Sequence, residues 1–116
     1  MLNTKELYKI HADFCKLMAN PKRIEILFLL GQKEMCVEEI ATAMDVKVPN
    51  ISQHLAVMRD KGVVNVSREG TRIYYKLADY RILKACTLMR EAMVDQMEKQ
   101  YEMVKGIERN SIKEGG

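Results

Sequence analysis

Residues 47–61, KVPNISQHLAVMRDK, carry short polar side chains at a spacing suited to reading nucleic-acid bases. At 100° per residue, three apolar side chains share one stripe that would dock on a core: Ile51, Leu55 and Met58. The opposite face carries Asn50 and Gln53, whose amides can pair with adenine in a major groove, and Ser52 on the flank can bond a base or a phosphate. An ordinary amphipathic helix with a solvated polar face is the alternative, and the residues that follow decide between the two.

Beyond Gly62 the hydrophobic period changes from 3.6 to 2, which predicts a β-hairpin. Its inward-facing apolar residues are Val64, Val66, Ile73, Tyr75 and Leu77. A turn at Glu69-Gly70 would pair Val66 with Ile73 and Val64 with Tyr75, so that both strands bury the same face.

Positive charge is concentrated on this helix and hairpin, although the whole chain has a net charge of only +3. Residues 47–76 carry six basic residues against two acidic ones: Lys47, Arg59, Lys61, Arg68, Arg72 and Lys76 against Asp60 and Glu69. Arg68 and Arg72 lie at the predicted tip, where they can contact the phosphate backbone or the minor groove. A solubilising charged turn would explain the tip alone, but the local surplus beside a polar-faced helix favours nucleic-acid binding.

Three helices should precede and position this segment. The periodicity predicts helices over residues 3–19, from Pro21 to Gly31 and over 36–44, with a break at Asn20-Pro21. The expected buried residues of the second and third are Ile24, Leu27, Phe28, Val37, Ile40, Ala41 and Met44. The connector 45–48 is so short that the third helix and residues 47–61 form a helix-turn-helix. No good capping residue precedes the latter helix, which begins after Lys47 or Val48.

A last helix is predicted from Tyr80 to Lys105. Its apolar seam consists of Ile82, Cys86, Met89, Met93, Met97, Tyr101 and Val104. Because a core of this size leaves that seam and much of the first helix uncovered, we expect a two-fold homodimer through the first and last helices. Residues 1–105 would then form one DNA-binding and dimerisation domain of the mainly α, winged helix-turn-helix class, followed by a loose tail at 106–116.

The composition is that of a globular protein, with 47% hydrophobic and 30% charged residues. No apolar run approaches the ~18 residues that a membrane span needs. The first ten residues lack the order of a signal peptide, so we expect a cytoplasmic protein with no membrane partner. Three cysteines, an odd number, fit reduced thiols in that compartment.

Four motifs in order, LMANPKRIEIL, CVEEIATAM, NISQHLAVMRDKGVV and SREGTRIYYKLAD, resemble the ArsR/SmtB family of winged-helix regulators over roughly residues 10–95. The resemblance implies a dimeric repressor that leaves its operator when a metal, metalloid or oxidised sulfur species binds. It makes the helix of residues 47–61 the recognition helix and 63–77 the wing. Lys47 and Pro49 replace the serines that the family usually has, so base preference does not carry over.

The sensor sites of the family are incomplete in this chain. Arsenic-responsive members have Cys-Val-Cys where this chain reads Cys36-Val37-Glu38, and a soft metalloid prefers two or three thiolates. The zinc pattern of the last helix keeps Asp79 but has Arg81, Ala92 and Asp95 at its other places. The cysteine pair of persulfide and peroxide sensors is replaced by Phe28 and Val94.

The three cysteines are nevertheless the candidates for an inducer site. His11 and Cys15 are four residues apart on one helix face, a spacing that can share a metal. Cys36 together with Cys15 is our hypothesis for a thiolate site, and Cys86 lies on the seam that faces the partner. For each, a small buried packing residue is the alternative.

The sequence therefore predicts a dimeric repressor that binds double-stranded operator DNA and responds to a thiol-reactive inducer, such as a thiolate-bound metal or metalloid. The predicted DNA contacts are Lys47, Asn50, Ser52, Gln53, His54, Arg59, Arg68 and Arg72. Alternatives are a repressor without an inducer and a winged-helix protein–protein module, which would not need the local charge surplus. An enzyme is not expected, because two separated histidines, His11 and His54, form no nucleophile–base grouping. His54 can instead be structural or contact a phosphate.

Overall fold

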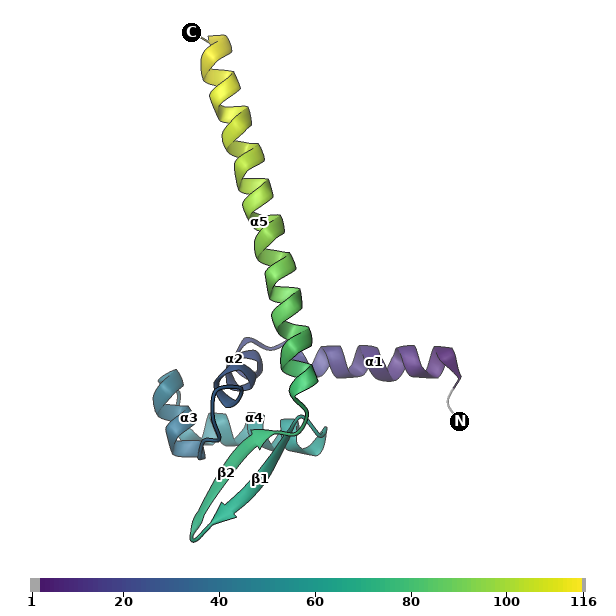
Figure 1. The fold of residues 1–116 in the computed structure, drawn as a ribbon, viewed down its shortest axis with the longest axis vertical. Helices are drawn as coiled ribbons and strands as arrows, with labels where there is room; N and C mark the ends of the chain where they lie inside the picture. Colours follow the sequence, from purple (N-terminus) through teal and green to yellow (C-terminus); the bar gives the residue numbers. More distant parts are fainter. Residues whose placement is uncertain (1–2, 116) are drawn as a thin grey trace. The chain divides into compact units, whose positions relative to one another are not determined.

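The computed structural model describes the backbone of residues 3–115 and the side chains as far as residue 110 (Figure 1). Its elements are α1 (Thr4–Met18), α2 (Pro21–Leu30), α3 (Val37–Met44), α4 (Val48–Asp60), β1 (Val64–Glu69), β2 (Arg72–Leu77) and α5 (Tyr80–Gly115). They form two compact units, one ending at Leu83 and the other beginning at Lys84. The first unit is a helix-turn-helix followed by a two-stranded antiparallel wing, as predicted.

The core of the first unit lies among α2, α3, α4 and the start of the wing. Its fully buried large side chains are Ile26, Leu27, Ile40, Ile51, Leu55, Met58, Val63 and Val64. The three residues predicted to anchor α4 are all 0% exposed, which confirms the face on which that helix docks. In α3, Ile40 and Ala41 are buried, while Val37 and Met44 are only half-buried.

The buried face of α2 differs from the prediction. Ile26 and Leu30 are buried with Leu27, whereas Ile24 and Phe28 are half-buried. The second half of α2 is apolar on all sides, so its periodicity does not define one face. Contacts with α3, α4 and β2 select the face instead.

A polar cap sets the start of α2, and a glycine follows its end. Asn20 Oδ1 accepts hydrogen bonds from the N–H groups of Lys22 and Arg23, at 3.0 and 3.2 Å, which explains the break before Pro21. At the other end, Gly31 has an ordinary helical φ of −67°. A Cβ at this position would meet Leu83 Cδ2 in the first turn of α5, so a larger residue would have to displace the Leu83 side chain.

The helix α4 begins without a side-chain cap and ends in a Schellman motif. Lys47 makes no capping hydrogen bond, as expected, and Pro49 lies in the first turn. Gly62 has φ +77°, its N–H bonds Arg59 O at 3.1 Å, and Val63 N–H bonds Met58 O at 2.8 Å. The glycine therefore fixes the turn that leads the chain from α4 into the wing.

We expect Gly62→Ala to lower the free energy of unfolding by about 1 kcal/mol, because an alanine is strained at positive φ. Gly106→Ala is the matched control: it lies inside α5 with no atom within 4 Å of the added Cβ. There, alanine should be neutral or stabilising by about 0.5–1 kcal/mol. Urea unfolding measures both, and an equal loss in the two variants would contradict this account of the turn.

The wing forms, but the predicted register is wrong. Val66 pairs with Tyr75 and Val64 with Leu77, while Glu69 pairs with Arg72. The two-residue loop is thus Gly70-Thr71, not Glu69-Gly70. Gly70 has φ +63°, the conformation that the first loop position of a type II′ turn requires. A shift of two residues preserves the alternation of faces, but Ile73, which was predicted to be buried, is 41% exposed near the tip.

A third strand-like contact at the wing has no counterpart in the sequence prediction. Met35 forms an isolated bridge with Tyr75, with Met35 N–H to Tyr75 O at 3.2 Å and Tyr75 N–H to Met35 O at 2.8 Å. The bridge ties the segment before α3 to the outer edge of β2, so the wing is held from two sides.

The helices α1 and α5 keep large apolar side chains in solvent. Leu7 and Ile10 of α1 are 55% and 50% exposed. The helix α5 continues to Gly115, past its predicted end at Lys105, because no proline or turn sequence follows. The domain boundary at residue 105 stays a prediction, and the side chains of 111–116 lie outside the described residues. None of the described helices is long and apolar enough to cross a bilayer.

Candidate nucleic-acid interface

The polar face of α4 is exposed above a fixed apolar stripe. Ser52 and Gln53 are exposed in its first two turns, while Ile51 and Leu55 on either side of them in the sequence are fully buried. The backbone of these turns is therefore held in place by the core. The backbone that carries a base-reading side chain is therefore already in place before binding.

A hollow of about 510 Å³ lies beside the N-terminal end of α4. It is lined by Lys22, Asp45, Val46, Lys47, Pro49, Asn50 and Gln53. Three predicted contacts, Lys47, Asn50 and Gln53, thus meet at one place. Asn50 is half-buried, and its Oδ1 is itself buried with no hydrogen-bond partner among the described residues. The side chain must therefore turn outward before this oxygen can accept a hydrogen bond from a base.

His54 is tied to α2 by an arginine that the sequence prediction missed. Arg23 Nε donates to His54 Nδ1 at 3.2 Å, and Arg23 Nη1 donates to Leu17 O at 2.9 Å. Burial, and then the charges of Arg23 and Lys22, lower the pKa of His54 below 6.5. The ring is therefore neutral at physiological pH, with Nδ1 as an acceptor and Nε2–H as a donor. That donor can still serve a phosphate.

The stability that His54 contributes should depend on pH. Because its pKa is lowered in the folded protein, the unfolded chain binds the proton more readily. The contribution is fully present above pH 6.5 and is lost as pH falls through the lower folded-state value. We expect the wild type to lose more unfolding free energy than His54→Gln between about pH 8 and about pH 5, measured by urea unfolding. Equal losses would show that His54 does not titrate in the folded protein.

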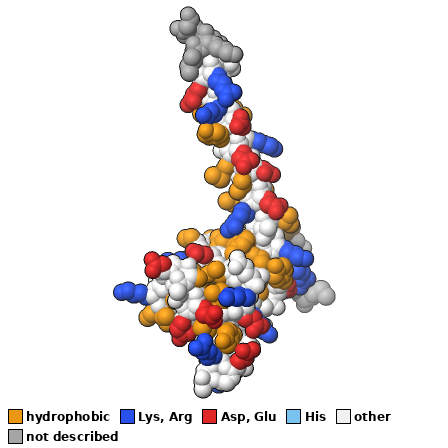
Figure 2. Space-filling view, turned by 60° about the vertical axis from the view of Figure 1, so that its left-hand side comes forward, with side chains coloured by type: hydrophobic (Ala, Val, Ile, Leu, Met, Phe, Trp, Pro, Cys, Tyr) orange, Lys and Arg blue, Asp and Glu red, His pale blue; other side chains and the backbone are white. Residues whose placement is uncertain are grey.

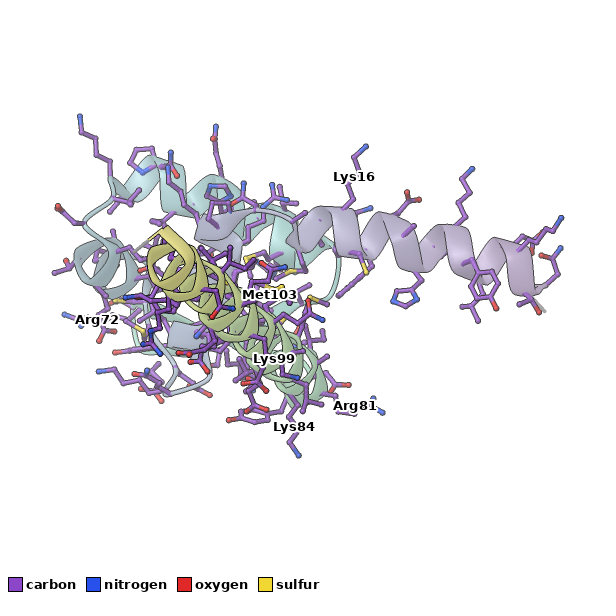
Figure 3. The ribbon with its side chains drawn as sticks, turned by 90° about the horizontal axis from the view of Figure 1, so that it is seen from above. Lys16, Arg72, Arg81, Lys84, Lys99 and Met103 are labelled. Atoms are coloured by element: carbon purple, nitrogen blue, oxygen red, sulfur yellow. The ribbon has the colours of Figure 1, made fainter. Side chains whose placement is uncertain are left out.

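The wing presents its two arginines to solvent. Arg68 and Arg72 are both exposed on the last pairs of the hairpin, and Arg72 is labelled in Figure 3. A hydrogen bond to the Tyr74 hydroxyl, and then the electrostatic influence of Tyr74, Cys36 and Glu39, raise the pKa of Arg72. The wing therefore presents two positive charges near its tip. Arg59 is exposed too, but at the opposite end of α4 from Lys47.

Lys22 and Arg23 are the residues that sequence reasoning passed over. Both lie in the first turn of α2, and they reach the hollow and His54 respectively. The sequence did contain a sign that this helix start could bind an anion, because the capped start Asn20-Pro21 is followed directly by two basic residues. Only the packing of α2 against α4 shows that this start lies beside the recognition helix.

A second hollow, of about 550 Å³, separates α3 from the wing. It is lined by Cys36, Val37, Glu38, Glu39, Thr71, Arg72, Ile73 and Tyr75. Cys36 is buried, its N–H donates to Glu39 Oε1 at 3.1 Å, and burial raises the pKa of its thiol. A protonated, buried thiol is a poor nucleophile and a poor metal ligand. These properties favour a packing role for Cys36.

The other two cysteines differ in exposure: Cys15 is exposed on α1 and Cys86 is half-buried on α5. Within the described part of the chain, no group of three His, Cys, Asp or Glu side chains could hold a metal ion.

Asp79 is the residue kept from the zinc pattern. It forms an ion pair with Arg81 at 2.6 Å, and its Oδ1 accepts a hydrogen bond from the backbone N–H of Arg81 at 2.9 Å. Those bonds lower the pKa of Asp79 to about 2, and its role is to cap α5.

Comparison with known proteins shows where this arrangement recurs. Residues 20–66 match the family described as "Bacterial regulatory protein, arsR family". The chain is 33% identical over 78 residues to the HTH-type transcriptional repressor SmtB of Mycobacterium tuberculosis. The aligned residues cover 67% of this chain and 58% of that protein. The chain thus spans less than two thirds of the length of that relative.

Two solved structures are similar over most of their length. The M. tuberculosis protein Rv0081 has a TM-score of 0.75 and 33% identity, covering 81% of this chain and 95% of that one. A homodimeric winged helix-turn-helix DNA-binding domain from Mycobacterium bovis has a TM-score of 0.70 and 32% identity, covering 82% and 92%. Together with the helix-turn-helix and its wing, these similarities show that the chain belongs to the ArsR/SmtB family of winged helix-turn-helix transcription regulators.

Proposed function

We propose that the protein is a homodimeric repressor that binds an operator in double-stranded DNA. The recognition helix α4 enters the major groove, where Gln53 and Asn50 read base edges. Ser52, Lys47 and His54 contact the adjacent phosphates, Arg59 does so at the far end of α4, and Arg68 and Arg72 reach the backbone or the minor groove from the wing. The observation that carries this proposal is the exposed polar face of α4, fixed by three residues with 0% exposure.

The dimer follows from the apolar surface that one subunit leaves uncovered. On α1, Leu7 and Ile10 are at least half exposed, and the seam of α5 is exposed from Met89 to Val104. A two-fold pairing through these helices buries both surfaces and presents two recognition helices. Half-sites of the operator should then lie about 34–36 Å apart, one turn of duplex. A related domain from M. bovis is homodimeric, which supports this assembly.

The most direct test is a gel shift on the DNA upstream of the protein's own coding sequence. We expect one complex of a dimer with duplex, competed by excess operator but not by unrelated duplex, and weakened by salt. A winged-helix protein–protein module would show no salt-dependent retention on duplex. Membership of a family of transcription regulators gives no support to an enzymatic function.

Release by a thiol-reactive inducer is the finer part of the proposal. Among the cysteines, Cys15 is exposed and lies one turn from His11, whereas the buried Cys36 is unfavourable as a ligand. Mass spectrometry of the dimer after titration with As(III), Cd(II) or a persulfide donor identifies any adduct. An inducer that prefers the unbound form by about 1–3 kcal/mol would lower operator affinity about 5- to 150-fold. Unchanged thiols and unchanged operator affinity would indicate a repressor without such an inducer.

A further inference from the structure

Arg23, in the first turn of α2, donates hydrogen bonds to two acceptors on different helices. Its Nε donates to His54 Nδ1 of α4 at 3.2 Å, and its Nη1 donates to the carbonyl oxygen of Leu17 near the end of α1 at 2.9 Å. All three segments lie in the unit that ends at Leu83. The guanidinium therefore bridges the end of α1 and the recognition helix.

The bridge is anchored before it reaches α4. Leu17 lies in the last turn of α1, where the carbonyl groups have no partner of their own within a regular helix, and a cation is favoured there by the helix dipole. The backbone of Arg23 is held as well, because its N–H donates to Asn20 Oδ1 at 3.2 Å. The guanidinium thus reaches His54 from a fixed backbone and a fixed carbonyl.

The bond to His54 selects one orientation of the imidazole ring. The χ2 torsion of a histidine is otherwise broad and roughly two-fold, and turning the ring over would place a carbon atom where Nδ1 now lies. Arg23 Nε would then lose its acceptor on α4. His54 is half-buried and follows the exposed Gln53, so this choice determines which edge of the ring stays available beside the polar face of α4.

The same bond determines where the imidazole proton lies. A guanidinium has only donors, so Nδ1 of His54 accepts and carries no proton. Burial, and then the charges of Arg23 and Lys22, lower the pKa of His54, which keeps the ring neutral. The one proton of the neutral ring is therefore on Nε2, and that N–H is a donor for an acceptor outside the bridge.

We propose that Arg23 is a positioning residue for operator binding, which fixes the orientation and tautomer of His54 so that Nε2–H meets a phosphate. The inference rests on the proposed function, which assigns that phosphate contact to His54. The bridge begins on α1, one of the two helices that carry the apolar surface of the proposed dimer; Figure 2 shows such side chains (orange) along the other, α5, among charged ones. Arg23 thereby joins a dimerisation helix to the recognition helix.

NMR correlation of the ring nitrogens with the ring carbon-bound protons reads the tautomer of His54 in the full-length protein. His11, exposed on α1, is the internal reference. In the wild type we expect the proton of His54 on Nε2 alone, whereas Arg23→Gln should move the His54 signals toward the averaged tautomers of His11. A proton on Nδ1 in the wild type would overturn the proposal even if the variant fails to fold, and so would His54 signals unchanged by the substitution.

A double-mutant cycle tests whether Arg23 acts through His54. Arg23→Gln and His54→Ala should each lower operator affinity at least about fivefold, and the double variant should stay within about twofold of His54→Ala. Arg23→Gln with Arg72→Gln is the control cycle, in which the two losses should multiply because Arg72 lies on the wing. Multiplied losses in the first cycle would mean that Arg23 contacts the DNA itself, which overturns the positioning role.

Arg23→Lys separates the geometry of the bridge from its charge. Lysine keeps the positive charge, but its single amino group does not reproduce the planar fork that reaches two acceptors. We expect its operator affinity at fixed salt to fall to within about twofold of that of Arg23→Gln. A lysine variant with wild-type affinity would show that charge alone is required and would overturn the proposal.

Failure of this inference is distinguishable from failure of the proposed function. A wild-type protein that binds no duplex DNA would overturn the repressor function and, with it, the contact of His54. Selective operator binding by the wild type, together with multiplied losses in the cycle of Arg23 and His54, would overturn the positioning role alone.

Discussion

Gln53→Ala should abolish most of the preference for operator over unrelated duplex while leaving the protein folded. Gln53 is exposed on the face of α4 opposite the buried stripe, so its loss opens no cavity in the core. A paired amide–adenine contact discriminates by about 1–3 kcal/mol, and a dimer makes it twice. The ratio of specific to non-specific affinity should therefore fall by about 30-fold or more.

Competition gel shifts with operator and scrambled duplex measure that ratio at fixed salt. Asn50→Ala should act in the same direction, because its amide lies beside the same hollow. Ala56→Ser is a useful control on the same exposed face, and it should keep the operator preference. An unchanged preference in Gln53→Ala would mean that another face of α4 reads the bases.

The docking face of α4 was predictable because its sequence separates apolar from polar residues cleanly. Ile51, Leu55 and Met58 repeat at a spacing of four and three residues, so the period fixed the buried side. Val48 continues the spacing in the first turn but is 38% exposed. The order of the helices and the wing followed from the same kind of local pattern, and the family from the resemblance of four motifs. These are the parts of a fold that short-range sequence specifies.

Features that depend on contacts between distant residues were not predictable. The register of the wing depends on whether Glu69 or Thr71 joins Gly70 in the loop, and only the pairing of the strands decides this. The bridge from Met35 to Tyr75 and the bond from Arg23 to His54 join segments more than thirty residues apart. No periodicity encodes such contacts.

The candidate site shows the same division between local and distant information. Its exposed polar and basic residues could be predicted from the polar face of the helix and from the local surplus of positive charge. The roles of Lys22 and Arg23 required the packing of α2 on α4, and the unfavourable surroundings of the Cys36 thiol required its burial. Sequence spacing identifies which residues lie on a surface, and tertiary packing determines which groups are available there.

Replacing both wing arginines should weaken binding to every duplex alike and flatten its salt dependence. Arg68 and Arg72 are exposed and contribute four positive charges to a dimer. Each phosphate contact contributes about 0.9 to the slope of log affinity against log salt, so Arg68→Ala/Arg72→Ala should make the slope shallower by about 3 to 4. The ratio of operator to unrelated duplex should change little, because backbone contacts carry no sequence information.

Filter binding or fluorescence anisotropy between about 50 and about 200 mM salt gives the slope. Arg109→Ala is the matched control, since it removes an exposed arginine from α5 that is not among the predicted DNA contacts. It should leave the slope unchanged. A double variant with the wild-type slope would show that the wing does not touch the phosphates, whereas a lost operator preference at constant slope would make the wing a reader of bases.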